Sequence, residues 1–310
     1  MSKMETGIIL KTTGSHYRVK VSNGDIVDCT IRGKLRLKGV KTTNPVTVGD
    51  FVQVELSDKN SGVITAVNDR KNYIIRKSTN LSRESHIIAA NLDQAVLVVT
   101  IEFPETQLGF IDRYLVTTEA YSIPAILVFN KVDLLNDAAI DKLNQYISIY
   151  EPIGYRCLIV SAQTGYNMNL FKELIQNKTS LISGNSGVGK STLVNTVEPD
   201  LKLKTNIISS AHLTGKHTTT FSEMFELSFG GYIIDTPGIK GFGLIDIEKE
   251  ELYHYFPEIF KLSSSCKYYN CTHIHEPGCA VIDAAKNGNI SPSRYLNYLS
   301  IYSDENEKYR

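Results

Sequence analysis

One segment near the middle of the chain has the residue types and spacing needed to bind phosphate. It fits G-x-x-x-x-G-K-[ST] and consists of Gly184, Asn185, Ser186, Gly187, Val188, Gly189, Lys190 and Ser191. An apolar run precedes it and a helical pattern beginning at Thr192 follows it, which is the context that the motif requires. Backbone N–H groups would face the phosphates, Lys190 would reach the β and γ phosphates, and Ser191 would ligate Mg²⁺. The segment therefore predicts a nucleoside triphosphate site.

A second motif, at residues 130–133, indicates which base is bound. Asn130, Lys131, Val132 and Asp133 directly follow the apolar run 125–129, at the carboxyl end of a predicted strand, where open α/β sheets bind ligands. Asp133 can accept hydrogen bonds from the guanine ring N–H and exocyclic amine, which adenine does not offer in that arrangement. Asn130 would hold the loop together, and Lys131 would lie along the base plane. The motif therefore favours GTP over ATP.

Two shorter motifs also follow predicted strands. Ser161 and Ala162 come after the apolar run 158–160, so the Ala162 N–H would face the guanine oxygen. Asp235, Thr236, Pro237 and Gly238 come after another such run. Asp235 would hold Mg²⁺ through water, and the Gly238 N–H would bond the γ-phosphate until hydrolysis. Both motifs are common by composition, and their positions after strands give them weight.

The segment 215–220, between the phosphate loop and Asp235, lies where a first switch is expected. Thr219 would close over Mg²⁺ in the GTP state. Ile239 stands where Ras-like enzymes have a glutamine that orients the attacking water, and its side chain cannot hydrogen-bond water. His217 is the candidate for that role, because a neutral imidazole can accept the water's hydrogen bond. A solvated loop histidine is the alternative.

The order of these motifs is rotated relative to that of an ordinary GTPase. An ordinary GTPase begins with the phosphate loop and ends with NKxD, whereas here residues 130–133 and 161–162 precede residues 184–191 and 235–238. A circularly permuted chain would keep every motif at its usual place in space. We therefore expect a circularly permuted P-loop GTPase domain.

Four potential metal ligands lie close together near the C-terminus. Cys266, Cys271, His273 and Cys279 supply three thiolates and one imidazole, which suits a closed, structural Zn²⁺ site. With four ligands, no coordination position stays open for chemistry. His275 is a spare ligand, so the spacing leaves open which imidazole binds. Reduced cysteines that cluster by accident are the alternative.

The apolar patterns predict a multidomain protein. Five short β-patterned runs within residues 5–75 predict an N-terminal OB-fold β-barrel. Residues 68–90 show neither helix nor strand period. From Asn91, apolar runs alternate with helical patterns, as in a mainly parallel α/β sheet. We expect an OB domain at 1–75, a linker at 76–90, the GTPase domain at 91–245 and a helical zinc-binding domain at 246–310.

Charge is unevenly distributed along the chain. Residues 1–75 contain 12 Lys and Arg against 7 Asp and Glu, in a chain with 33 of each. Five of these cations lie in residues 32–41, between predicted barrel strands, where OB-folds carry nucleic-acid-binding loops. RNA is the expected partner, and a solvated loop is the alternative. With no apolar run of about 20 residues and no signal-peptide pattern, we expect a cytoplasmic protein with no membrane partner, and nothing demands more than a monomer.

Together, these parts in this order resemble the bacterial ribosome small-subunit-dependent GTPases, the RsgA, YjeQ or YloQ family. The resemblance covers nearly the whole chain. It implies a late-acting assembly factor that binds the 30S subunit and its 16S rRNA, hydrolyses GTP when the subunit stimulates it, and then leaves. It also implies one zinc ion at Cys266, Cys271, His273 and Cys279, Mg²⁺ with GTP, and a catalytic role for His217.

Two alternatives belong to other functional classes. The chain could be an RNA-binding protein regulated by guanine nucleotides with little turnover, although Lys190, Ser191 and Asp235 are intact. It could also be an ATP-dependent P-loop kinase, which Asp133 disfavours. A further hypothesis follows from the motif order, because the second switch runs directly into the zinc domain. GTP would then fix the relation between the barrel and the zinc domain so that both grip ribosomal RNA.

Overall fold

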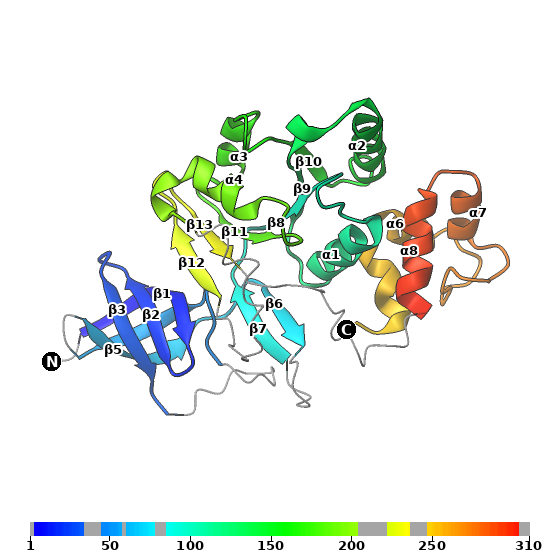
Figure 1. Ribbon diagram of the computed structural model, residues 1–310. Coiled ribbons are helices and arrows are strands. Elements are labelled where there is room, and N and C mark those ends of the chain that lie inside the picture. The colour runs from blue at the N-terminus through cyan, green and yellow to red at the C-terminus, as the bar shows by residue number, and fades with distance from the viewer. Residues whose placement is uncertain are drawn as a thin grey trace, which may run out of the picture.

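The computed structural model describes residues 3–33, 45–57, 60–77, 85–203, 222–235 and 247–303. Within these ranges the chain forms an N-terminal barrel, a central α/β domain and a C-terminal group of helices. The barrel and the C-terminal helices lie at opposite ends of the α/β domain (Figure 1). None of the helices in these ranges has the length and apolarity to cross a membrane.

The N-terminal domain is a closed barrel of five strands, as predicted for an OB-fold. Its strands are β1 (Lys3–Thr13), β2 (His16–Val21), β3 (Ile26–Ile31), β4 (Phe51–Leu56) and β5 (Ser61–Val67). The order β1-β2-β3-β5-β4 closes through pairing of β4 with β1. Alternate residues face inward, and Val19, Val52 and Ile64 have no exposed surface. The period-two pattern of the sequence therefore corresponds to side chains that point alternately into the barrel and out to solvent.

The α/β domain is a mainly parallel sheet covered by helices on both faces. Its strands run in the order β10 (Arg156–Ile159), β9 (Ala125–Phe129), β8 (Gln94–Val99), β11 (Thr179–Ser183), β13 (Tyr232–Asp235) and β12 (Glu223–Glu226), with only β12 antiparallel to its neighbour. One face packs on α1 (Leu108–Ala120) and α2 (Asp137–Tyr150), the other on α3 (Met168–Ile175) and α4 (Lys190–Val197). Both faces of β8 are buried, which explains its continuous apolar run.

The sequence predicted no strand within residues 68–90, and this prediction is wrong. This stretch contains β6 (Tyr73–Lys77) and β7 (Ser85–Ala90), which pair as a two-stranded antiparallel sheet. Ile74, Ile87 and Ala89 are at most 1% exposed, because this small sheet packs between the barrel and the α/β domain. The isoleucines and alanines that the structure describes in this stretch are all buried, whereas its polar composition had suggested a linker.

The barrel is joined to the α/β sheet by β-pairing. Strand β1 has a bulge between Ile9 and Lys11, and Lys11 pairs with Glu223 of β12. Ile9 therefore points into the barrel core, whereas the next residue, Leu10, packs in the core of the α/β domain. Such re-aiming of a side chain is what a bulge does. As a result, the strands of both domains form one continuous eleven-stranded sheet.

The C-terminal part is helical, as predicted. It contains the 3₁₀ segment η3 (Lys249–Tyr255) and the helices α6 (Pro257–Ser263), α7 (Ala280–Lys286) and α8 (Pro292–Ser303). Its core includes Phe256, Ile259 and Tyr298, and Val116 of α1 belongs to the same cluster. The C-terminal helices therefore pack directly on the α/β domain through α1 (Figure 1).

Candidate nucleotide site and metal centre

The phosphate loop connects the end of β11 to the start of α4, as predicted. Gly184, Gly187 and Gly189 have φ angles of 143°, 85° and 94°, a region that favours glycine. The close approach of the Val98 carbonyl oxygen, 2.5 Å from where a Cβ of Gly184 would lie, also requires a glycine. Lys190 bends back over the loop, and its Nζ donates to the carbonyl oxygens of Gly184 and Asn185 at 2.7 and 2.8 Å. The loop and its lysine thus form a compact cationic cradle.

Lys190, Ser191 and Asp235 place one cation and two side-chain groups with oxygen donors at this cradle. Lys190 is 6% exposed. Burial lowers its pKa to about 8, and the Asp235 carboxylate opposes that effect. Burial raises the pKa of Asp235, Lys190 lowers it and Glu223 adds to the rise. The Ser191 hydroxyl is buried with no hydrogen-bond partner in the described part of the chain. A hydroxyl and a carboxylate are oxygen donors that fit Mg²⁺.

The candidate base-reading loop follows β9, and Asn130 ties it to its neighbours, as expected. Asn130 Nδ2 donates to the Val188 carbonyl in the phosphate loop at 2.9 Å, and its Oδ1 accepts from the Ala162 N–H at 3.2 Å. The Ala162 N–H, assigned from the sequence to the guanine oxygen, therefore has a partner within the protein. The Ser161 hydroxyl donates to Asp133 Oδ1 at 2.5 Å, and the Asp133 side chain is exposed.

A third loop that the sequence had not indicated touches both candidate motifs. It follows β8, and the N–H of Thr106 donates to the Thr100 carbonyl at 2.8 Å to close it. The Phe103 carbonyl accepts from Lys131 Nζ at 2.5 Å, and the Pro104 ring lies 3.3 Å from where a Cβ of Gly187 would be. The sequence offered one clue, because this loop follows a predicted strand just as the two motifs do. In the sheet, β8 lies between β9 and β11, and all three parallel strands end at the same edge.

Some predicted site residues lie outside the described residues. They are Thr236, Pro237, Gly238, Ile239, the segment 215–220 with His217 and Thr219, and most of the basic loop 32–41. Of that loop, the structure describes Arg32 and Gly33, and Arg32 Nη2 lies 2.9 Å from Glu55 Oε2.

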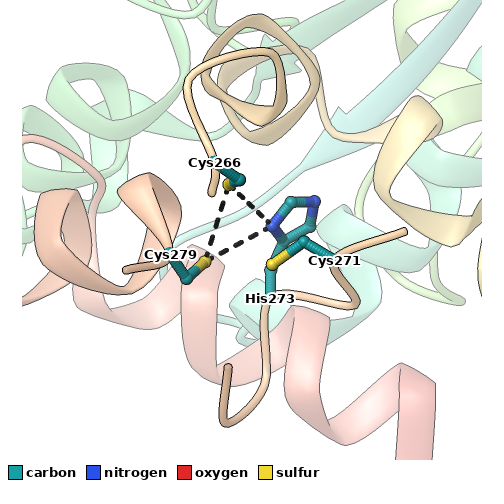
Figure 2. Close-up of side chains that lie close together, drawn as sticks. All are labelled: Cys266, Cys271, His273 and Cys279. Carbon is teal, nitrogen blue, oxygen red and sulfur yellow. Dashed lines mark hydrogen bonds between the residues drawn. The ribbon is translucent and has the colours of Figure 1, made fainter. Parts of the chain in front are cut away.

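The predicted metal ligands lie together in one cluster. The ligand atoms of Cys266, Cys271, His273 and Cys279 all lie within 4.8 Å of one another (Figure 2). His273 points its Nδ1 at the Sγ atoms of Cys266 and Cys279, 3.5 Å from each. His275, the spare candidate, has an exposed side chain outside the cluster. The geometry thus selects the imidazole that the spacing alone had left open.

The electrostatics of this cluster fit a metal ion. Burial lowers the pKa of His273, which favours the neutral imidazole that binds metal. Burial raises the pKa of Cys271 to about 12 and also raises that of Cys279. Three sulfurs packed this closely can be thiolates only if a cation compensates them. Three thiolates and one imidazole in a compact, largely buried set could hold a metal ion.

Glu276, which the sequence reasoning missed, organises the loop that carries His273. The backbone N–H groups of Thr272, Ile274 and His275 donate to its carboxylate at 2.7, 3.0 and 3.1 Å. Burial alone would raise the pKa of Glu276, but the bonds from the Thr272 hydroxyl and these N–H groups hold it well below its usual range. An ionised carboxylate therefore fixes the backbone on which the imidazole is mounted.

Comparison with known proteins gives a consistent result. A family model described as RsgA GTPase matches residues 67–245, and one described as RsgA N-terminal domain matches residues 6–64. The small ribosomal subunit biogenesis GTPase RsgA 2 of Bacteroides thetaiotaomicron is 55% identical over 305 residues, covering 98% of each chain. The corresponding RsgA of Flavobacterium psychrophilum is 54% identical and covers 98% of this chain and 94% of its own.

Two solved structures share this fold. YjeQ from Thermotoga maritima has a TM-score of 0.79 at 35% identity, with 97% of this chain and 98% of that chain covered. YloQ, described as a circularly permuted GTPase, has a TM-score of 0.72 at 28% identity, with 97% and 95% covered. The rotated motif order, the phosphate loop on a parallel sheet and these matches agree, and the chain belongs to the RsgA GTPase family of circularly permuted GTP hydrolases.

Proposed function

We propose that this protein binds the small (30S) ribosomal subunit late in its assembly, hydrolyses GTP when the subunit stimulates it, and then dissociates. The observation that carries the proposal is the convergence of the candidate phosphate loop, base-reading loop and Asp235 at one edge of the sheet. The relatives are named small ribosomal subunit biogenesis GTPases, and these names support the choice of the small subunit as the partner.

The proposed nucleotide site assigns a task to each loop. Residues 184–192 cradle the phosphates, and Lys190 exchanges its bonds to the Gly184 and Asn185 carbonyls for bonds to phosphate oxygens. Asp133 reads the guanine edge, while Lys131 flanks the base and Ser161 orients the Asp133 carboxylate. The Asn130 bond to the Val188 carbonyl holds the base-reading and phosphate loops in register, and its bond from the Ala162 N–H adds the loop at 161–162.

Mg²⁺ bound with GTP would neutralise charge on the β- and γ-phosphates. Ser191, Asp235 and Thr219 are the residues that we assign to hold it. Lys190 is placed to stabilise the charge that develops on the transferred phosphate. We assign the γ-phosphate contact to the Gly238 N–H and the positioning of the attacking water to His217.

The domains flanking the nucleotide site are proposed to bind ribosomal RNA. We assign residues 1–75 as the barrel that contacts 16S rRNA, residues 91–245 as the GTPase domain and residues 246–310 as the domain built around one structural zinc ion. The stretch 76–90 connects the first two and shares the β6–β7 sheet. A monomer acting in the cytoplasm, where subunits assemble, completes the proposal.

The test is GTP turnover of the purified protein with and without 30S subunits. We expect slow turnover alone and strong stimulation by 30S, with gains in comparable GTPases reaching about 10⁵-fold. His217→Ala should lose the stimulation while retaining GDP affinity, and His275→Ala, which changes an exposed histidine outside the metal cluster, should keep it. If 30S subunits do not raise the turnover of the wild type or of either variant, the result would instead favour an RNA-binding protein that guanine nucleotides merely regulate.

A further inference from the structure

Three charged residues lie in a row across the junction between the barrel and the α/β sheet. Lys11 of β1 pairs directly with Glu223 of β12, and Glu223 pairs directly with Asp235 of β13. Directly opposed residues on neighbouring strands place their side chains on the same face, with Cβ atoms about 5 Å apart. The barrel thus contributes a cation to the same face of the sheet that carries Asp235.

The two carboxylates in this row are compensated from different domains. Lys11 Nζ lies 2.9 Å from Glu223 Oε2, and the two side chains are 35% and 34% exposed. Asp235 has the ammonium of Lys190 as its nearby cation. Like charges directly opposite one another destabilise a sheet. Glu223 can therefore face Asp235 at low cost only while Lys11 neutralises it.

A second ion pair joins the same two domains and serves as a built-in comparison. Lys20 of β2 lies 2.6 Å from Glu226, also on β12. Glu226, however, is opposite Tyr232, at the other end of β13 from Asp235. The two pairs therefore join the barrel to the same strand, β12, but of the two only the Lys11–Glu223 pair lies beside the proposed magnesium ligand.

We propose that the Lys11–Glu223 pair sets the electrostatic potential at Asp235, so that a residue of the barrel tunes how tightly the GTPase site holds Mg²⁺. This rests on the proposed assignment of Asp235 to Mg²⁺. With both partners charged, the pair adds no net charge beside the metal. Loss of Lys11 leaves an uncompensated carboxylate that attracts the cation, and loss of Glu223 leaves an uncompensated ammonium that repels it.

The experiment measures release of a fluorescent GDP analogue as a function of Mg²⁺ concentration. Relative to wild type, Lys11→Met should lower the Mg²⁺ concentration that half-maximally slows release, and Glu223→Gln should raise it, each by about threefold or more at low salt. The double variant, which is again neutral, should return close to wild type. Lys11→Arg and Glu226→Gln should leave the value unchanged.

Opposite shifts separate an electrostatic role from a structural one, because a weakened joint between the domains would move both single variants in the same direction. Shifts of the same sign, or an equal shift in Glu226→Gln, would overturn the inference. Mg²⁺-dependent release that is identical in every variant would overturn it while leaving the magnesium site standing. Release that does not depend on Mg²⁺ in the wild type would refute the assignment of Asp235 and the inference together.

Discussion

Arg294 donates a hydrogen bond from Nη1 to Asp112 Oδ1 at 2.8 Å, and both side chains are at most 1% exposed. The same guanidinium donates to Glu258 Oε1 at 2.7 Å, and Asn297 donates to the second oxygen of Asp112. Burial alone would lower the pKa of Arg294, but the two carboxylates raise it, so the residue stays charged. Since Asp112 belongs to α1 and Arg294 to α8, this buried network joins the C-terminal domain to the GTPase domain.

Arg294→Met should destabilise the protein strongly, because it leaves two carboxylates buried without a cation. Breaking a buried ion pair typically costs about 3–5 kcal/mol. The measurement is urea unfolding monitored by circular dichroism. Arg18→Met is the control, since Arg18 and Asp28 form an exposed pair at 3.7 Å and such pairs contribute at most about 1 kcal/mol. Equal losses in the two variants would contradict a stabilising role for the buried network.

GDP affinity should depend on pH through Lys190. The nucleotide-free protein has a Lys190 pKa of about 8, and bound phosphate favours the charged form. Below that pH the free lysine already carries its proton, so affinity should be constant. Above it, binding must include proton uptake, so affinity should fall by up to about tenfold per pH unit. Titrations between about pH 7 and 9 should show this slope in the wild type and a flat profile in Lys190→Met.

Asp133→Asn should weaken GDP binding by about a hundredfold or more, because two hydrogen bonds to a charged acceptor contribute about 1.5–3 kcal/mol each. The asparagine amide can donate to the additional oxygen of xanthine, so the variant should prefer xanthosine diphosphate. Competition binding with both nucleotides measures the exchange of preference. Asp137→Asn, an exposed acidic residue at the start of α2, should behave as wild type. Unchanged guanine preference in Asp133→Asn would exclude this residue as the base reader.

Cys271→Ser should abolish binding of one zinc ion per chain and lower the thermal midpoint of the C-terminal domain, since Cys271 is one of four clustered ligands and is 5% exposed. Metal content by mass spectrometry and unfolding with and without a chelator provide the two readouts. Cys157→Ser, outside the cluster, should retain both metal and midpoint. If native protein purified with zinc present contains none, the cluster is not a zinc site.

Local pattern in the sequence was enough to predict most of the elements and the positions of the motifs at their ends. The strand 125–129 has the bounds of the predicted apolar run, and five strands form within residues 3–67 as predicted, because apolar runs and period-two burial depend on neighbours along the chain. The phosphate loop and the cysteine cluster could also be predicted, because each motif lies within a short stretch of sequence. The rotated order of motifs predicted the permutation, since an order is itself a property of sequence.

Contacts between distant segments were decided only by the tertiary structure. The β6–β7 sheet was missed because its few apolar residues gain their burial from two other domains. The choice of His273 over His275 depends on the backbone that Glu276 fixes, and the Arg294–Asp112 bond joins residues far apart in sequence. The bulge at Leu10 and the row from Lys11 to Asp235 arise from the pairing of β1 with β12, a register that neither strand specifies alone. Side-chain patterns record which face of an element is buried, whereas the partner of that face is settled when the elements pack.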